Sequence, residues 1–228
     1  GKPTANAAFG NQISVLVGDY LLAKSINLAA REGNIAVIEV FSKVTVGLSE
    51  GEVLQITAKG DVDTSEETYL TIIHKKTAGF IAGCCEVGAM LAQSTPTALA
   101  ALTRYGLNCG LAFQIADDPV KTGKPLCGDL REGKMTLPLI LTLHDVTETE
   151  RRDLLHILQE PEALTDAEIA NVRDTIARHD GYARTADTAR RYVAPTDSFA
   201  SAADPALSGP RRRARAHRGD PPFHGGRV

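Results

Sequence analysis

The segment from Ala78 to Ala92 constrains the fold more than any other part of the chain, because almost every residue in it is apolar. Drawn as a helix it has no polar face, and such a helix is normally buried at the centre of a protein. It contains Glu86, and it is shorter than the ~20 apolar residues that a membrane-spanning helix needs. We therefore expect a central core helix and no integral membrane span.

Helical spacing of apolar residues continues through most of the chain. It runs from Asn6 to about Arg31, and from Ile35 to about Lys59 with an interruption near Gly47 and Gly51. Strict alternation of apolar and polar residues is weak, so no strand is predicted. With 43% hydrophobic but only 5% aromatic residues, the core must be packed by Leu, Ala, Ile and Val. We predict an all-α fold.

Several predicted helices carry recognisable start signals. Thr95-Pro96 places a capping residue before a proline at the first helical position, which opens a helix predicted to run to Asp118. A Thr followed three residues later by Glu forms a capping box, in which each side chain accepts a hydrogen bond from the other residue's backbone N–H. The chain offers three such pairs, Thr64 with Glu67, Thr147 with Glu150 and Thr165 with Glu168.

Composition excludes some classes of function. The net charge of -3 gives no overall attraction to nucleic acid, so we predict no nucleic-acid partner. No secretory signal opens the chain, and because it starts without Met we expect an N-terminal truncation. The four cysteines form no C-x-x-C pair, and we expect them to be reduced, buried thiols of a cytoplasmic protein: Cys84, Cys85, Cys109 and Cys127.

Composition changes after Tyr192, which we take as the end of a helical domain covering residues 1–192. Residues 193–228 are rich in Pro, Gly, Ala and Arg and have neither apolar periodicity nor capping signals. We predict that this tail is disordered or comes from an altered reading frame. Its basic cluster, Arg211 to Arg215, is predicted to be solvated, with nucleic acid or anionic lipid as alternative partners.

Two adjacent carboxylates close the helix that starts at Pro96. Gln114, Asp117 and Asp118 stand at positions i, i+3 and i+4 and therefore share one helix face. Buried carboxylates are unfavourable unless they are paired or bind a metal ion, and Mg²⁺ prefers carboxylate oxygens. The alternative is a helix end with two solvated aspartates, which the glycine- and lysine-containing segment downstream disfavours.

Basic side chains suited to phosphate lie on both sides of these carboxylates. A segment downstream that contains several glycines carries Lys124 and Lys134. Their ammonium groups can bind the phosphate oxygens that are not bound to the metal ion. Upstream, Lys76 and Thr77 are predicted to open a helix, where free N–H groups and the helix dipole favour an anion. Together these groups predict a site for a metal-bridged diphosphate.

The stretch from Gly110 to Asp118, followed by the segment from Gly123 to Pro138, resembles the second aspartate-rich region of trans-polyprenyl diphosphate synthases. The resemblance runs from about Gly1 to Tyr192. It implies an all-α helical bundle around a central cavity, and a homodimer. It also implies the head-to-tail condensation of isopentenyl diphosphate onto an allylic diphosphate, with Mg²⁺ as cofactor and a long-chain product for quinone side chains.

The resemblance also implies roles for individual residues. Asp117 and Asp118 are expected to bind Mg²⁺, with Asp129 as a metal-side or orienting group. Gln55 is expected to support the ligand-binding residues from behind. The expected catalytic residues are Lys76, Thr77 and Gln114, and the same three together with Lys124 and Lys134 are expected to bind diphosphate.

The chain departs from the family pattern in two places. The family's first aspartate-rich motif, and an arginine pair that binds isopentenyl diphosphate, are expected before Gly1. In the second motif Lys121 occupies the position of the third aspartate, and the loop between Asp118 and Gly123 is shorter than in the family. We therefore expect the 228-residue chain to bind Mg²⁺–diphosphate weakly and to lack prenyl transfer. The alternatives are a non-catalytic subunit that dimerises with and regulates an active synthase, and a terpene cyclase relative.

Overall fold

The computed structural model describes residues 3–117 and 127–201, and this part of the chain contains helices and no strands. The all-α prediction is therefore confirmed. A π-helical segment, η1 (His74–Ala78), joins α3 to α4, and a 3₁₀ turn, η2 (Pro161–Ala163), precedes α9. The α-helices of the described residues are α1 (Ala5–Arg31), α2 (Ile35–Thr57), α3 (Glu66–Ile73), α4 (Gly79–Leu91), α5 (Pro96–Asp117), α6 (Cys127–Arg131), α7 (Leu137–Asp145), α8 (Glu148–Leu158), α9 (Asp166–Arg178) and α10 (Gly181–Ser201).

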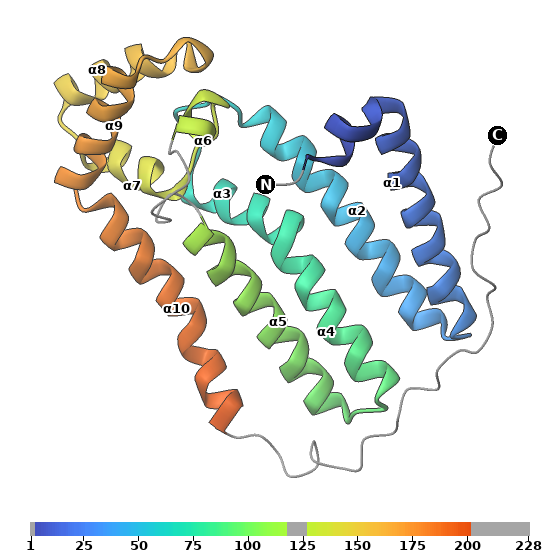
Figure 1. Ribbon diagram of the computed structural model, residues 1–228. Helices are drawn as coiled ribbons and strands as arrows, with labels where there is room; N and C mark the ends of the chain where they lie inside the picture. Colours follow the sequence, from blue (N-terminus) through green and yellow to red (C-terminus); the bar gives the residue numbers. More distant parts are fainter. Residues whose placement is uncertain (1–2, 118–126, 202–228) are drawn as a thin grey trace.

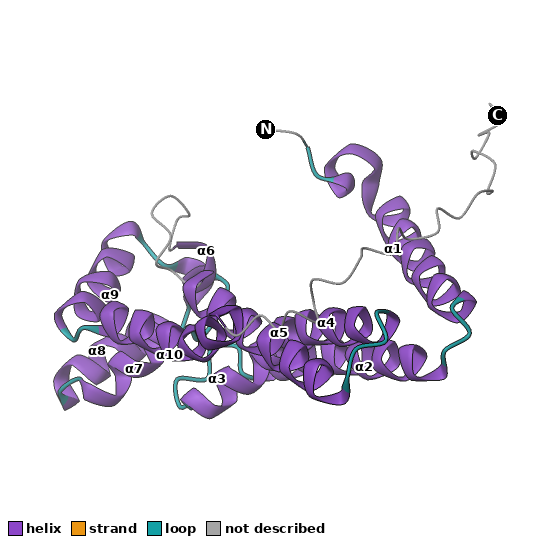
Figure 2. Ribbon diagram, turned by 90° about the horizontal axis from the view of Figure 1, so that it is seen from below, coloured by secondary structure: helices purple, strands orange, loops and turns teal. Residues whose placement is uncertain are grey.

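The long helices lie side by side in chain order, α1 next to α2, then α4, α5 and α10 (Figure 1). The most extensive contacts are those of α5 with α4 on one side and with α10 on the other. Figure 2 shows α2, α4, α5 and α10 as one layer, from which α1 extends away. Helices α7, α8 and α9 pack together at one end of this layer.

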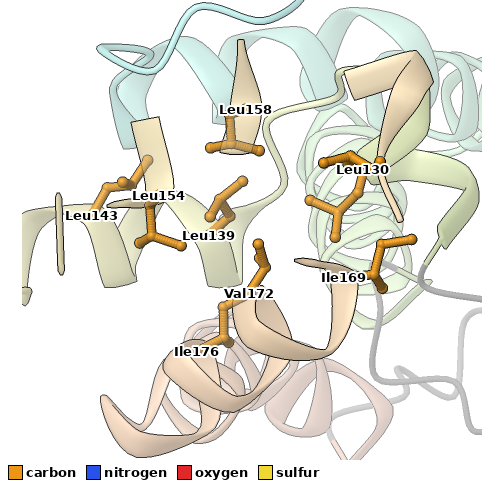
Figure 3. Packing of buried hydrophobic residues seen from close by; sticks show 9 residues of the cluster. Leu130, Leu139, Leu143, Leu154, Leu158, Ile169, Val172 and Ile176 are labelled. Atoms are coloured by element: carbon orange, nitrogen blue, oxygen red, sulfur yellow. The ribbon is translucent and has the colours of Figure 1, made fainter. Parts of the chain in front are cut away.

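Two clusters of buried hydrophobic residues stabilise this arrangement, and α7 contributes to both. The first lies between α6, α7, α8 and α9 (Figure 3) and consists of Leu130, Leu139, Leu143, Leu154, Leu158, Leu164, Ile169, Val172 and Ile176. The second lies where α3, η1, α5 and α7 meet and consists of Tyr69, Ile73, Ala78, Leu111, Ile115, Leu137, Ile140 and Leu141. Because residues 137–143 are all buried, α7 joins the α8–α9 pair to the helical layer.

Most predicted helix starts are confirmed. Thr95 caps α5, where its hydroxyl oxygen accepts a hydrogen bond from the Ala98 backbone N–H at 3.2 Å. Helices α8 and α9 begin with complete capping boxes, Thr147 with Glu150 and Thr165 with Glu168. The two capping boxes were predictable because each depends on two residues three positions apart, and the start of α5 because its capping threonine directly precedes a proline.

The capping box predicted at Thr64 is wrong. Ser65 caps α3 instead, since its hydroxyl oxygen accepts a hydrogen bond from the Thr68 backbone N–H at 3.0 Å. Thr64 is buried, and its own hydroxyl donates to the Asp61 carbonyl at 2.6 Å. This hydrogen bond directs the Thr64 hydroxyl toward the preceding turn, and α3 begins one residue later than predicted.

Two further helices differ from the sequence prediction. Helix α2 continues without interruption through Gly47 and Gly51. Helix α10 continues past Tyr192 to Ser201, so residues 193–201 are helical where the tail is predicted to be disordered. Ala189 and Tyr192 of α10 pack against the second hydrophobic cluster, and an established helix extends at low cost because each added residue gains a backbone hydrogen bond. The rest of the predicted tail, residues 202–228, lies outside the described residues.

Glycines allow neighbouring backbones to approach η1 closely. A Cβ atom added at Gly110 of α5 would lie 2.5 Å from the Cα atom of Ala78. A Cβ atom added at Gly51 of α2 would lie 2.8 Å from the Cβ atom of Lys75. Carbon atoms pack best at about 3.5–4.0 Å, so a side chain at either position would force the helices apart.

Helix α1 differs from the others because it has no buried residue. Its apolar side chains are exposed, including Phe9 at 69% and Leu16 at 62%. It is also the one described helix that is long and apolar enough to cross a membrane, with a mean hydropathy of 1.3 over its most apolar 18 residues. Length and composition alone are weak evidence for a span, because helices of soluble proteins meet the same criterion.

We expect Gly110→Ala to destabilise the protein, because the added methyl group would overlap the Ala78 backbone, which cannot rotate away. Overpacking of this kind costs about 1–3 kcal/mol. The higher helix propensity of alanine offsets up to about 1 kcal/mol of this cost. Urea denaturation followed by circular dichroism measures the change in the free energy of unfolding.

Gly88→Ala is the matched control, since Gly88 is also helical but has no atom within 4 Å of an added Cβ. This variant should keep its free energy of unfolding or gain up to about 1 kcal/mol. Equal stability of the two variants would show that α5 and η1 are not held together by this contact.

Candidate functional site

A cavity of about 250 Å³ lies where the C-terminal ends of α2 and α5 meet α3, η1 and the segment from Asp129 to Thr136. Charged side chains of both signs face this small volume. Its lining residues are Gln55, Ala58, Lys59, Tyr69, Ile72, Ile73, Lys76, Gln114, Asp117, Asp129, Lys134, Met135 and Thr136.

Lys76 reaches the cavity from the middle of a helical rod. Helices α3 and α4 are continuous through η1, so the prediction that Lys76 and Thr77 open a helix is wrong. No glycine or proline stands in α3 or directly before Lys76 to end the helix. Tyr69 and Ile73 are buried in the second hydrophobic cluster and hold α3 in place up to the start of η1. Lys76 lines the cavity, whereas Thr77 does not.

The π-helical turn of η1 is wider than an α-helical turn. The Gly79 N–H donates to the carbonyl of His74, five residues earlier. Such segments are rare, and they occur frequently at functional sites. Here the wider turn contains both neighbouring lysines, Lys75 and Lys76, and only the second of them lines the cavity.

Two side chains of α2 hold the Lys76 ammonium group. Its Nζ atom donates to Oε1 of Gln55 at 2.8 Å and lies 2.6 Å from Oε2 of Glu52. Gln55, expected behind the ligand-binding residues, is itself part of the cavity wall. The neighbouring Lys75 pairs with Glu50 instead.

Lys134 reaches the cavity from the segment that leads into α7. Its Nζ atom lies 3.1 Å from Oδ1 of Asp129 and 2.5 Å from Oε2 of Glu132. Burial works against the charge on Lys134, but the hydrogen bonds and charges of Glu132 and Asp129 outweigh it and raise the pKa of Lys134. The hydrogen bond from Lys134 is also the main cause that lowers the pKa of Glu132.

Gln114 and Asp117 lie one turn apart at the end of α5, and both line the cavity. Their common helix face, predicted from their spacing, is therefore the face that meets the lysines. Asp118 and Lys124 lie outside the described residues. The cavity thus brings together six of the residues singled out in the sequence: Gln55, Lys76, Gln114, Asp117, Asp129 and Lys134.

Three charged residues near the cavity were missed from the sequence. Lys59 lines it and lies 3.5 Å from Glu162, and nothing in the local sequence marks this position. Glu52 contacts Lys76 and Glu132 contacts Lys134, although neither glutamate lines the cavity. Glu52 was detectable in principle, because it stands three residues before Gln55 and therefore shares its helix face.

The cavity offers groups for a polyvalent anion and a divalent cation together. Among residues 3–117 and 127–201, no three His, Cys, Asp or Glu side chains form a group that could hold a metal ion. Asp117 and Asp129 supply two carboxylates, and Mg²⁺ is commonly held by one or two carboxylates plus substrate phosphates. The residues therefore fit a metal ion that is shared with a phosphorylated ligand.

Comparison with known proteins agrees with this chemistry. The model of the polyprenyl synthetase family matches residues 1–176. Octaprenyl diphosphate synthase of Escherichia coli is 40% identical over 154 residues, which are 64% of this chain and 48% of that protein. All-trans-nonaprenyl-diphosphate synthase of Rhodobacter capsulatus is 42% identical over 162 residues, covering 68% of this chain and 49% of that protein. The chain thus spans about half the length of these curated relatives.

Solved structures of related enzymes have the same fold. A decaprenyl diphosphate synthase from Rhodobacter capsulatus superimposes with a TM-score of 0.79 at 33% identity, covering 86% of this chain and 62% of the other. A polyprenyl synthase from Caulobacter crescentus, solved in complex with calcium and isoprenyl diphosphate, gives a TM-score of 0.78 at 34% identity. That match covers 87% of this chain and 62% of the other.

We expect Lys134→Ala to raise the pKa of Glu132 toward its ordinary value of 4.5, because the hydrogen bond from Lys134 is the main cause of the lowering. Carbon NMR of the Glu132 carboxyl group, followed through an acid titration, measures this pKa. Lys59→Ala is the control, since Lys59 contributes the weakest of the lowering effects. Equal shifts in the two variants would show that the contact between Lys134 and Glu132 does not form in solution.

Proposed function

This chain belongs to the polyprenyl synthetase family, and we propose that it acts in the head-to-tail condensation of isopentenyl diphosphate onto an allylic diphosphate. The observation that carries the proposal is the cavity in which Lys76 and Lys134 face the same volume as Gln114 and Asp117. Ammonium groups beside a carboxylate are what a metal-bridged diphosphate requires. Because two relatives are named octaprenyl and nonaprenyl diphosphate synthases, we propose a long-chain product of the kind used for quinone side chains.

In the proposed reaction, the protein stabilises the negative charge that develops on diphosphate as the allylic C–O bond breaks. Lys76 and Lys134 donate hydrogen bonds to phosphate oxygens, and Gln114 orients the same group through its amide. Preorganised charge of this kind lowers a reaction barrier by about 3–4 kcal/mol for each donor. Asp117 and Asp118 would hold Mg²⁺, which supplies further positive charge to the leaving diphosphate.

The apolar part of the cavity has a separate role in this proposal. Tyr69, Ile72 and Ile73 line it beside the charged groups and are buried. An apolar wall excludes water from the carbocation-like centre that forms when diphosphate departs. The double bond of isopentenyl diphosphate then attacks this centre in place of water, and the resulting cation loses a proton to give the product. Thr77, which does not line the cavity, and Lys124, which lies outside the described residues, remain predicted diphosphate ligands.

We expect Lys76→Ala and Lys134→Ala each to weaken the binding of magnesium pyrophosphate by roughly tenfold or more, because a hydrogen bond to a charged group contributes about 1.5–3 kcal/mol. Isothermal titration calorimetry measures the dissociation constant. Lys75→Ala is the matched control, since Lys75 pairs with Glu50 and does not line the cavity. Equal loss of affinity in all three variants would contradict a specific role for the cavity.

The second candidate function is a non-catalytic subunit that regulates an active synthase. It is favoured by Lys121, which stands where the family has the third aspartate of its metal-binding motif. A relative 35% identical over 201 residues is itself named heptaprenyl diphosphate synthase component 2, from Geobacillus stearothermophilus. Transfer of radiolabelled isopentenyl diphosphate to farnesyl diphosphate, measured with the chain alone and then with an added active synthase, separates the candidates. A regulatory subunit changes the rate of the added synthase, whereas a synthase adds at most its own activity.

We propose that the chain is a cytoplasmic protein that forms a homodimer through α1. Helix α1 has no buried residue, and large apolar surfaces are rare on monomers. Symmetric pairing of two copies is the commonest way to cover such a surface. The prediction that the cysteines are buried is wrong for those described, because Cys84 is exposed and Cys85 and Cys109 are half-buried. As free thiols, these three are consistent with a reducing compartment.

We expect sedimentation equilibrium to give twice the mass of the chain at micromolar concentration, and Leu16→Asp to shift the protein toward monomer. A charge at this exposed apolar position of α1 would have to be desolvated in the interface. Flotation with lipid vesicles tests the membrane alternative for the same helix. A monomeric wild-type protein that floats with vesicles would contradict the proposed dimer.

A further inference from the structure

Glu52 has no part in the function proposed above, although it contacts a residue of the site. Its Oε2 atom lies 2.6 Å from Nζ of Lys76, and the partner of the same ammonium group within the cavity wall is Gln55. Glu52 is not among the residues that line the cavity, and its side chain is 54% exposed. Lys76 is therefore held by a neutral amide on the inside and by a carboxylate on the outside.

Lys134 is held in a similar way. Asp129 lines the cavity and lies 3.1 Å from Nζ of Lys134. Glu132 lies 2.5 Å from the same atom, does not line the cavity and has a side chain that is 61% exposed. Lys76 and Lys134, which lie in distant segments of the chain, are thus each paired with an exposed glutamate outside the cavity.

The packing of α2 against η1 keeps Glu52 aligned with Lys76. A Cβ atom added at Gly51 would lie 2.8 Å from Cγ of Lys76 and 3.0 Å from its backbone nitrogen, so the two segments are in close contact. The residues on either side of Gly51, Glu50 and Glu52, pair with Lys75 and Lys76 respectively. Glu50 and Lys75 form the same kind of ion pair as Glu52 and Lys76, but neither Glu50 nor Lys75 lines the cavity.

We propose that Glu52 and Glu132 compete with diphosphate for the two lysines, and thereby weaken its binding and speed its release. This inference rests on the proposed function, because it concerns the same diphosphate site. A carboxylate in contact with an ammonium group repels the phosphate oxygens that approach that group. Binding energy that is equal for substrate and transition state does not raise the rate of the chemical step. A site that must also release diphosphate can therefore bind it less tightly, and so release it faster, without slowing the chemical step.

The exposure of both glutamates limits the size of the effect. Exposed ion pairs change an equilibrium constant by no more than about fivefold, and salt screens them. We therefore expect Glu52→Gln and Glu132→Gln each to tighten the binding of magnesium pyrophosphate by about two- to fivefold at low salt. Because the two glutamates act on different lysines, the double variant should show roughly the product of the two changes.

Isothermal titration calorimetry of the 228-residue chain with magnesium pyrophosphate measures the affinity, and stopped-flow displacement measures the dissociation rate. Glu50→Gln is the matched control, because it removes the same charge two residues away without touching a lysine of the cavity. Glu52→Asp keeps the charge and should bind as the wild type does. Circular dichroism verifies that every variant is folded.

Tighter binding and slower dissociation in Glu52→Gln and Glu132→Gln, but not in Glu50→Gln, would support the proposal. Unchanged or weaker binding in the first two variants would overturn it and leave the proposed function intact, provided that Lys76→Ala weakens binding by about tenfold or more. Equally tighter binding in Glu50→Gln would show that the change in affinity comes from the overall charge of the protein, and would also overturn the proposal. Failure of the wild type and all variants to bind pyrophosphate would overturn the proposed function and this inference together.

Discussion

The close contact between η1 and α5 at Ala78 and Gly110 sets the spacing of the central helices. Ala78 is fully buried, and there is no room for a Cβ atom between it and Gly110. Gly51 allows α2 to approach η1 in the same manner. Because interiors are close-packed and repulsion rises steeply at short range, helices in such contact have little freedom to slide or rotate.

This packing places the charges of the site. Lys76 stands two residues before Ala78 in η1, and Gln114 stands one helical turn after Gly110 on α5, so the contact brings both side chains to one cavity. Lys134 arrives on the segment that precedes α7, a helix buried between the two hydrophobic clusters. Rigid elements therefore support the site from each side, which is what precise positioning of charged groups requires.

The charges in the cavity are balanced rather than uniformly positive. Each of the two lysines is in contact with acidic or amide side chains, and the acidic end of α5 faces the same volume. A site that only had to hold an anion would be better served by unpaired cations. Paired cations suit a site where a metal ion, a diphosphate and protein carboxylates share the same space, because each charge that enters finds a partner.

The helical fold, the capping boxes of α8 and α9, and the shared face of Gln114 and Asp117 could be predicted from the sequence, because they depend on residues three or four positions apart. Tertiary structure alone decided that α3 continues through η1, that Lys59 reaches the cavity, and that Glu52 meets Lys76. Such outcomes depend on how surfaces of distant segments fit together, and the periodicity of a single helix does not encode its neighbours. Gly51 and Gly110 allow backbones far apart in the chain to come into contact, which is a property of pairs of helices and not of either one.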